Sequence, residues 1–154
     1  MPSITLPVVL DEPTQQSRYV HGTIERAGIG VSYVPLLSVL GGGPTTIDYI
    51  SVLTDEQLVW QLRTGGELMQ PEWQPPDGNP TPGPLVDADA VGIMGGQIVA
   101  AGLCAKTTNA GTTELIRNFN VDMAEGEPLT LCVRRLSGTG GIVSAVMTWA
   151  TNTA

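Results

Sequence analysis

Along most of the chain, apolar and polar residues alternate with a period of two, the spacing of a half-buried β-strand. The stretch 19–26 is the first example, and the turn residues 27–28 close it. A second apolar stretch, 31–40, contains Pro35, which confines it to a sheet edge or a bulge. The run 41–44, three glycines and a proline, predicts a break. The first part of the chain is therefore expected to form short strands joined by turns.

The segment 45–63 has two interpretations. Alternation predicts a strand over its first residues, and Thr54 could then cap a short helix that ends at the glycines 65–66. Alternatively, the same residues form a hairpin turn before a strand in which Leu58, Trp60 and Leu62 share one face. We favour the hairpin, because the neighbouring segments are predicted to be strands.

The second half of the chain contains five further strand candidates, separated by glycine-rich or proline-containing turns. They cover residues 91–101, 103–107, 114–121, 129–136 and 142–151. In the last of them, one face is predicted to carry Val143, Ala145, Met147 and Trp149, and the other Ile142, Ser144, Val146 and Thr148. Because both faces are apolar or small, we expect this strand to be covered twice, by its own core and by another subunit.

The first residues form a separate feature. Prolines at positions 2, 7 and 13 exclude a helix and favour an extended backbone. Between them lie five apolar residues, Ile4, Leu6, Val8, Val9 and Leu10. The segment is either an edge strand of the same domain or an arm that reaches a neighbouring subunit. We treat 1–16 as an extended N-terminal arm with these five residues as its interface, since monomers avoid exposing such apolar surface.

A long loop is predicted at 71–84, which holds six of the 12 prolines. It could be a linker between two domains, but each half would then be marginal for independent folding. We therefore expect one domain over 17–154 with a long Pro-rich loop, a feature that is usually functional or mobile. Trp73 is the candidate residue of this loop, either as an anchor in a neighbour's pocket, which we favour, or as an exposed recognition ring.

The pattern as a whole comprises eight to ten strands and at most one short helix. It predicts an all-β fold, an antiparallel β-sandwich, and we expect a jelly roll, the commonest way to fold this many strands with long connections.

The charge and the cysteine content of the chain indicate which classes of binding partner and which cellular compartment to expect. The 154 residues carry a net charge of −8, and Lys106 is the single lysine, so we expect neither nucleic acid nor an anionic membrane as a partner. The start of the chain has neither a basic segment nor a long apolar run, so secretory and transmembrane signals are not expected. Cys104 and Cys132 match no metal or redox motif; we favour two buried free thiols over a disulfide, in a protein made in a reducing cytoplasm.

The sequence contains few candidate residues for catalysis, metal binding or phosphate binding. His21 is the single histidine, and a triad would have to pass through it, but a sheet-face or surface histidine is the simpler interpretation. Asp77, Asp87 and Asp89 lie on or near the long loop and could bind calcium, yet no fixed-spacing acidic loop is present. The glycine runs lack the lysine and helix of a phosphate loop. We therefore expect a non-enzymatic protein without a cofactor or metal.

In style, the chain resembles the small jelly-roll structural proteins of tailed-bacteriophage virions, such as capsid decoration (cement) proteins and head-fibre bases. The resemblance lies in the arm at 2–10, the scarcity of lysine, the Gly/Thr/Ala-rich strands and the ending at 146–152. No motif aligns, so no site residue is carried over.

This resemblance implies a homo-oligomer, with a trimer favoured, that binds the major capsid protein or another virion protein and resides in the virion. The alternative from another functional class is a carbohydrate- or ligand-binding β-sandwich that uses Trp73 and the 71–84 loop.

Overall fold

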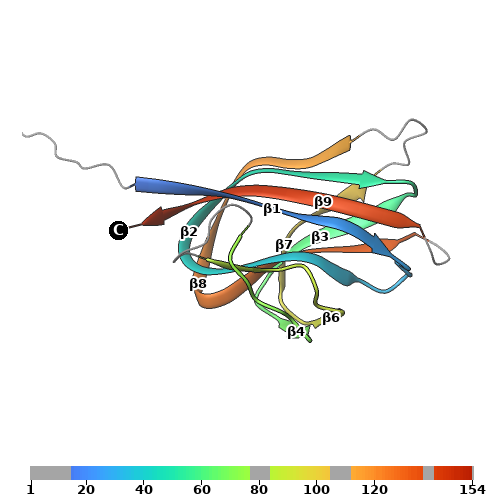
Figure 1. Ribbon diagram of the computed structural model, residues 1–154, viewed down its shortest axis with the longest axis horizontal. Helices are drawn as coiled ribbons and strands as arrows, with labels where there is room; N and C mark the ends of the chain where they lie inside the picture. Colours follow the sequence, from blue (N-terminus) through green and yellow to red (C-terminus); the bar gives the residue numbers. More distant parts are fainter. Residues whose placement is uncertain (1–14, 77–83, 105–111, 137–140, 154) are drawn as a thin grey trace, which may run out of the picture.

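The computed structural model describes residues 15–76, 84–104, 112–136 and 141–153. These residues form strands and loops, with no helix among them, so the predicted all-β antiparallel fold is confirmed (Figure 1). The strands in chain order are β1 Gln15–Ala27, β2 Val34–Thr54, β3 Leu58–Thr64, β4 Glu67–Met69, β5 Leu85–Asp87, β6 Gly92–Met94, β7 Gln97–Cys104, β8 Thr112–Arg135 and β9 Ile142–Thr153.

Two long strands, β2 and β8, organise the fold. The main sheet has the order β1-β9-β2-β8-β3-β7, and β5 pairs with the first part of β2. Because β2 and β8 bend together, as Figure 1 shows, their two halves belong to two layers of a barrel-like sandwich. The first layer is β1, β9, the second half of β2 and the first half of β8. The second layer is β5, the first half of β2, the second half of β8, β3 and β7.

The bend lies at the glycine run that was expected to break the chain. Gly41 pairs with Glu127 and Gly43 with Met123, so one residue of β2 faces three residues of β8. Such extra residues form a bulge, which bends a strand without ending it. The break predicted at 41–44 and the separation of the strand candidates 114–121 and 129–136 are therefore wrong, although glycines there permit the bend; Gly126, for instance, has a φ of 80°.

The segment after Thr54 is a strand and not a helix. Thr54 Oγ1 accepts a hydrogen bond from the Glu56 amide at 3.1 Å and donates one to the Glu56 carbonyl at 2.9 Å, which closes a tight turn before β3. The favoured strand over Leu58–Thr64 is confirmed, with alternate residues buried. The hairpin is wrong, however, because β3 pairs with β8 and β7 and not with β2.

Two strand boundaries predicted in the second half of the chain also differ from those in the structure. The expected strand at 91–101 is divided at Gly95 and Gly96, both with positive φ, into β6 and β7. The expected gap near residue 102 does not exist, because β7 runs through to Cys104.

The core fills the space between the two layers. From the first layer, Tyr19 stacks on Trp149 with ring centroids 5.6 Å apart. From the second layer, Leu58, Leu62 and Leu131 are at most 2% exposed. Polar contacts also tie β1 to the opposite layer: Thr23 Oγ1 donates to the Leu36 carbonyl at 2.8 Å, and the Arg26 guanidinium donates to the carbonyls of Ala88 and Ala90. These contacts hold the layers together on the side of β1.

Candidate assembly surfaces

The outward side of the first layer carries a group of exposed apolar side chains. We call this group the apolar outer face, and it comprises Val20, Leu53, Ile142 and Val146, between 37% and 48% exposed. Pairing places them on neighbouring strands, because Val20 lies opposite Thr148 on β9 and Leu53 opposite Ser144. The residues between them are small or carry hydroxyl groups. The expected division of β9 is thus confirmed on its inner side, where Val143, Ala145, Met147 and Trp149 are buried.

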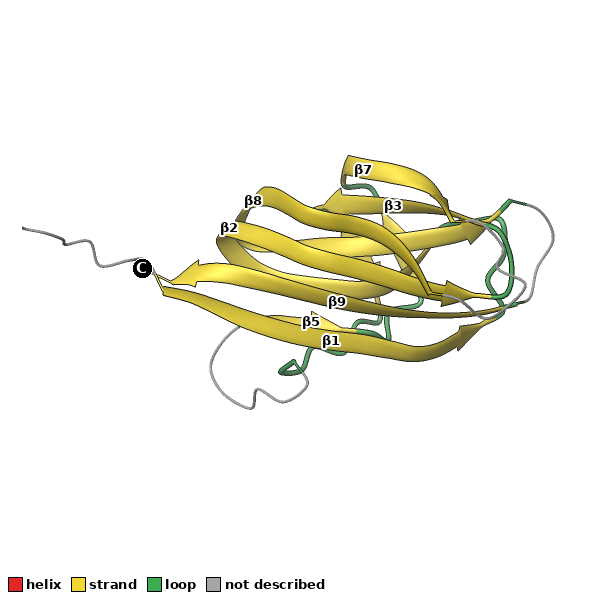
Figure 2. Cartoon of the chain, turned by 90° about the horizontal axis from the view of Figure 1, so that it is seen from above, coloured by secondary structure: helices red, strands yellow, loops and turns green. Residues whose placement is uncertain are grey.

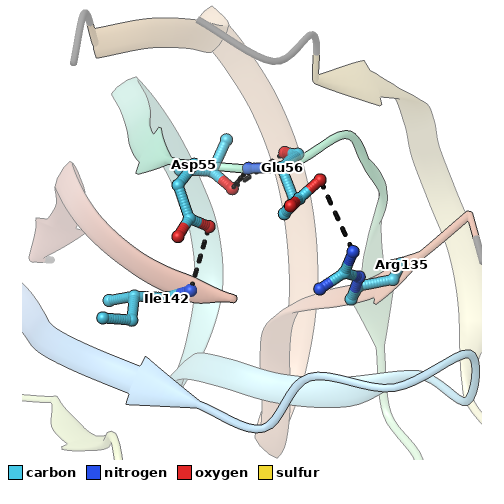
Figure 3. A network of polar contacts seen from close by, with 5 residues as sticks. Asp55, Glu56, Arg135 and Ile142 are labelled. Atoms are coloured by element: carbon cyan, nitrogen blue, oxygen red, sulfur yellow. Dashed lines mark hydrogen bonds and ion pairs between the residues drawn. The ribbon is translucent and has the colours of Figure 1, made fainter. Parts of the chain in front are cut away.

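Charged groups border this face at both ends. At one end, Arg18 of β1 forms an ion pair with Asp48 of β2. At the other end, Figure 3 shows Asp55 pointing toward Ile142 at the start of β9 and Glu56 pointing toward Arg135 at the end of β8. Asp55 Oδ1 accepts a hydrogen bond from the Ile142 amide at 3.0 Å.

Glu56 completes the same end of the sandwich, since its Oε2 lies 3.4 Å from Arg135 Nη2 (Figure 3). The adjacent Gly141 has a φ of 85°, and a Cβ atom there would come within 3.0 Å of Asp55 Oδ1. Glycine is thus required at 141, and the turn 55–57 fixes where β9 and its exposed Ile142 begin.

A second exposed apolar strip runs along β7, the last strand of the sheet. Leu103, at 70%, is the most exposed large hydrophobic side chain among the described residues, and Ile98 is 50% exposed. Leu103 pairs with Val59, and the exposed Ala101 pairs with Gln61. This strip was not predicted from the sequence. The sequence feature that could have predicted it is the eight-residue run Gln97–Cys104, which contains no charged residue.

Hydrogen bonds attach the start of the Pro-rich loop to the second layer. Gln74 and Val86 exchange two backbone hydrogen bonds, 2.9 and 2.7 Å long. The buried carboxylate of Asp87 accepts a hydrogen bond from the Glu72 amide at 2.7 Å and from the Asp89 and Ala90 amides at 3.1 Å. Between these ties, Trp73 is half-buried and not fully exposed.

Several sequence candidates lie outside the described residues. These are the five arm residues Ile4, Leu6, Val8, Val9 and Leu10, together with Asp77 and the loop residues up to 83.

The titratable and nucleophilic candidates lie in the interior. His21 is 4% exposed beside Met147 and Trp149, as expected of a sheet-face histidine. Cys104 and Cys132 are buried thiols that are not joined in a disulfide, as predicted. Burial raises the pKa of the Cys132 thiol to about 12, against an opposing effect of Arg63. The described residues contain no cluster of three or more His, Cys, Asp or Glu side chains suited to a metal ion.

Comparison of the chain with protein-family models, curated proteins and solved structures finds no match. Within the described ranges there is also no helix long and apolar enough to cross a membrane. The surfaces described above therefore provide the functional argument.

Proposed function

We propose that this chain is a non-enzymatic structural subunit of a virus particle, of the capsid decoration type, which binds and stabilises the shell. The observation that carries the proposal is the apolar outer face, Val20, Leu53, Ile142 and Val146. A group of exposed apolar side chains on one sheet face, bordered by charges, is typical of a protein–protein contact, and permanent assemblies use the more apolar interfaces. In this proposal the sandwich is a jelly roll, and the subunit forms a homo-oligomer, with a trimer favoured.

The N-terminal arm supplies a second contact in this proposal, either to a neighbouring subunit or to the major capsid protein. Its five apolar residues would be expensive to leave in water. The half-buried ring of Trp73 favours an anchoring role over sugar binding, because a sugar-binding platform offers a whole ring face to its ligand.

The first experiment is the native mass of the full chain, measured by light scattering at micromolar concentration. We expect an oligomer, and we expect Val146→Asp to shift it to the mass of one chain. Val31→Asp is the matched control, because Val31 is 54% exposed but lies in the β1–β2 connection. A wild-type chain that stays monomeric would overturn the assembly proposal.

The second experiment tests the virion role. A tagged full-length chain expressed in its infected host is expected to sediment with virus particles in a density gradient. Recovery only in the soluble fraction, with particles free of the tag, would overturn the virion role even if the chain were oligomeric.

A further inference from the structure

The two edges of the main sheet differ in how they are protected. The described part of β1, at one edge, carries Arg18, Glu25 and Arg26, and its register shifts between Thr23 and Arg26. Charges of this kind block the addition of another strand. β7, at the other edge, pairs with β3 alone among the described strands. Its register with β3 also shifts, at Val99 between Ile98 and Ala100, but β7 has no charged or proline residue. Its exposed Ile98 and Leu103 make it a template for a further apolar strand.

We propose that residues 4–10 of a second copy of this chain add to β7 as an extra strand. This inference rests on the proposed assembly function and identifies where the arm binds. Strand addition to an open sheet edge takes its affinity from backbone hydrogen bonds and its specificity from alternate side chains. The β7 edge and residues 1–10 both lack charged side chains, so pairing them buries no unpaired side-chain charge.

The arm fits this edge in length. Its seven residues match the eight residues of β7, since both span about 3.3 Å per residue when extended.

The position of Pro7 also fits. In an added outermost strand, alternate residues direct their backbone groups away from the sheet, so a proline is tolerated there. If Pro7 occupies such a position, then Leu6 and Val8 on either side of it direct their backbone groups toward β7. Their side chains then share one face.

A second copy is the better source of the arm than the chain's own N-terminus. β1, which follows the arm, is the other terminal strand of the main sheet, five positions from β7 in the sheet order and in the other layer. Figure 2 shows the start of β1 and the strand β7 at opposite edges of the molecule. The four residues 11–14 that would connect them extend over at most about 14 Å. A contact between two different surfaces is heterologous, and it closes into a ring if the rotation allows, as a trimer requires.

The test is disulfide formation between two full-length variants. Leu6→Cys and Ala101→Cys proteins are mixed in equal amounts and oxidised, and the products are separated by mass under denaturing, non-reducing conditions. We expect a covalent heterodimer of one copy of each variant. The matched control pairs Leu6→Cys with Glu25→Cys, an exposed position on β1, and should give at least tenfold less product.

A disruption variant provides an independent measurement. Leu103→Lys introduces an edge charge at a side chain that is 70% exposed, so the fold should persist by circular dichroism. It should lower the yield of the Leu6–Ala101 cross-link at least tenfold, whereas Val31→Lys should not.

Equal cross-linking in the control pair, or no effect of Leu103→Lys, would overturn arm addition at β7. A chain carrying both Leu6→Cys and Ala101→Cys that closes the bond within one copy at low concentration would also overturn it. The proposed function is tested separately. If Val146→Asp dissociates the oligomer but no arm cross-link forms, the assembly role is still supported and only this inference is overturned.

Discussion

The indole of Trp60 on β3 lies against the backbone of Gly102 on β7, its partner across the sheet. A Cβ atom at Gly102 would come within 2.8 Å of Trp60 Nε1, closer than Cβ atoms approach other heavy atoms in folded proteins. Gly102 therefore lets the tryptophan ring cover the β7 backbone from the core side. This contact positions the edge strand to which we assign the arm.

The first prediction follows from this contact. Gly102→Ala should lower the free energy of unfolding by about 1–3 kcal/mol, because the new methyl group overpacks against the indole. In a Trp60→Leu background the same substitution should cost less, and urea unfolding of the four proteins measures the difference. Gly22→Ala is the control, since its Cβ would meet only ordinary contacts at 3.4 Å. Equal costs in both backgrounds would refute the steric explanation.

The second prediction concerns a buried hydroxyl pair between β2 and β8. Ser38 Oγ and Thr130 Oγ1 are 2.9 Å apart, and both residues are at most 1% exposed. Thr130→Val should cost about 1–3 kcal/mol, because the Ser38 hydroxyl then loses a partner in a dry environment. Ser38→Ala combined with Thr130→Val should cost clearly less than the two single changes added together. Strict additivity in chemical denaturation would show that this hydrogen bond contributes nothing.

The inner and outer faces of β9 could be predicted from sequence, because alternation with a period of two directly reports which side meets the core. Met147 and Trp149 are buried and Val146 is exposed, as the pattern requires. The same reasoning identified β3 as a strand. It could not identify β8 as the neighbour of β3, since alternation contains no information on pairing partners.

The glycine run at 41–44 shows another limit of the sequence. A glycine-rich segment is compatible with a turn that ends a strand and with a bulge that bends one, and only the paired residues of β8 decide between them. The open edge at β7 depends likewise on sheet order. The arm and β7 are each visible in the sequence as uncharged stretches, but which strand is left at the edge is a property of the whole fold.

The third prediction tests the attachment of the Pro-rich loop. Asp87→Asn keeps the shape of the side chain but replaces one acceptor oxygen with an amide that donates, opposite backbone amides that also donate. The change should cost about 1.5–3 kcal/mol and expose the loop to proteases. Urea unfolding and limited proteolysis followed by mass spectrometry measure both effects. Asp89→Asn is the control because Asp89 is exposed, and equal behaviour of the two variants would contradict the anchoring role of Asp87.

The fourth prediction concerns alkaline pH and the thiol of Cys132. Its pKa is about 12 in the folded protein and 9.0 as the reference value, so the unfolded chain loses this proton first as the pH rises. The stabilising effect of the neutral buried thiol is complete below pH 9 and is lost progressively between pH 9 and 12. From pH 8 to pH 10 this group alone should lower the free energy of unfolding by roughly 1 kcal/mol.

Urea unfolding of the wild type and of Cys132→Ala at both pH values isolates this contribution. All other titrating groups are common to the two proteins, so the wild type should lose roughly 1 kcal/mol more than the variant. The same burial predicts that Cys132 of the folded chain resists a thiol reagent at pH 8 and reacts once urea unfolds the protein. An identical pH dependence in both proteins, or fast labelling of native Cys132, would show that the thiol reaches solvent in the folded state.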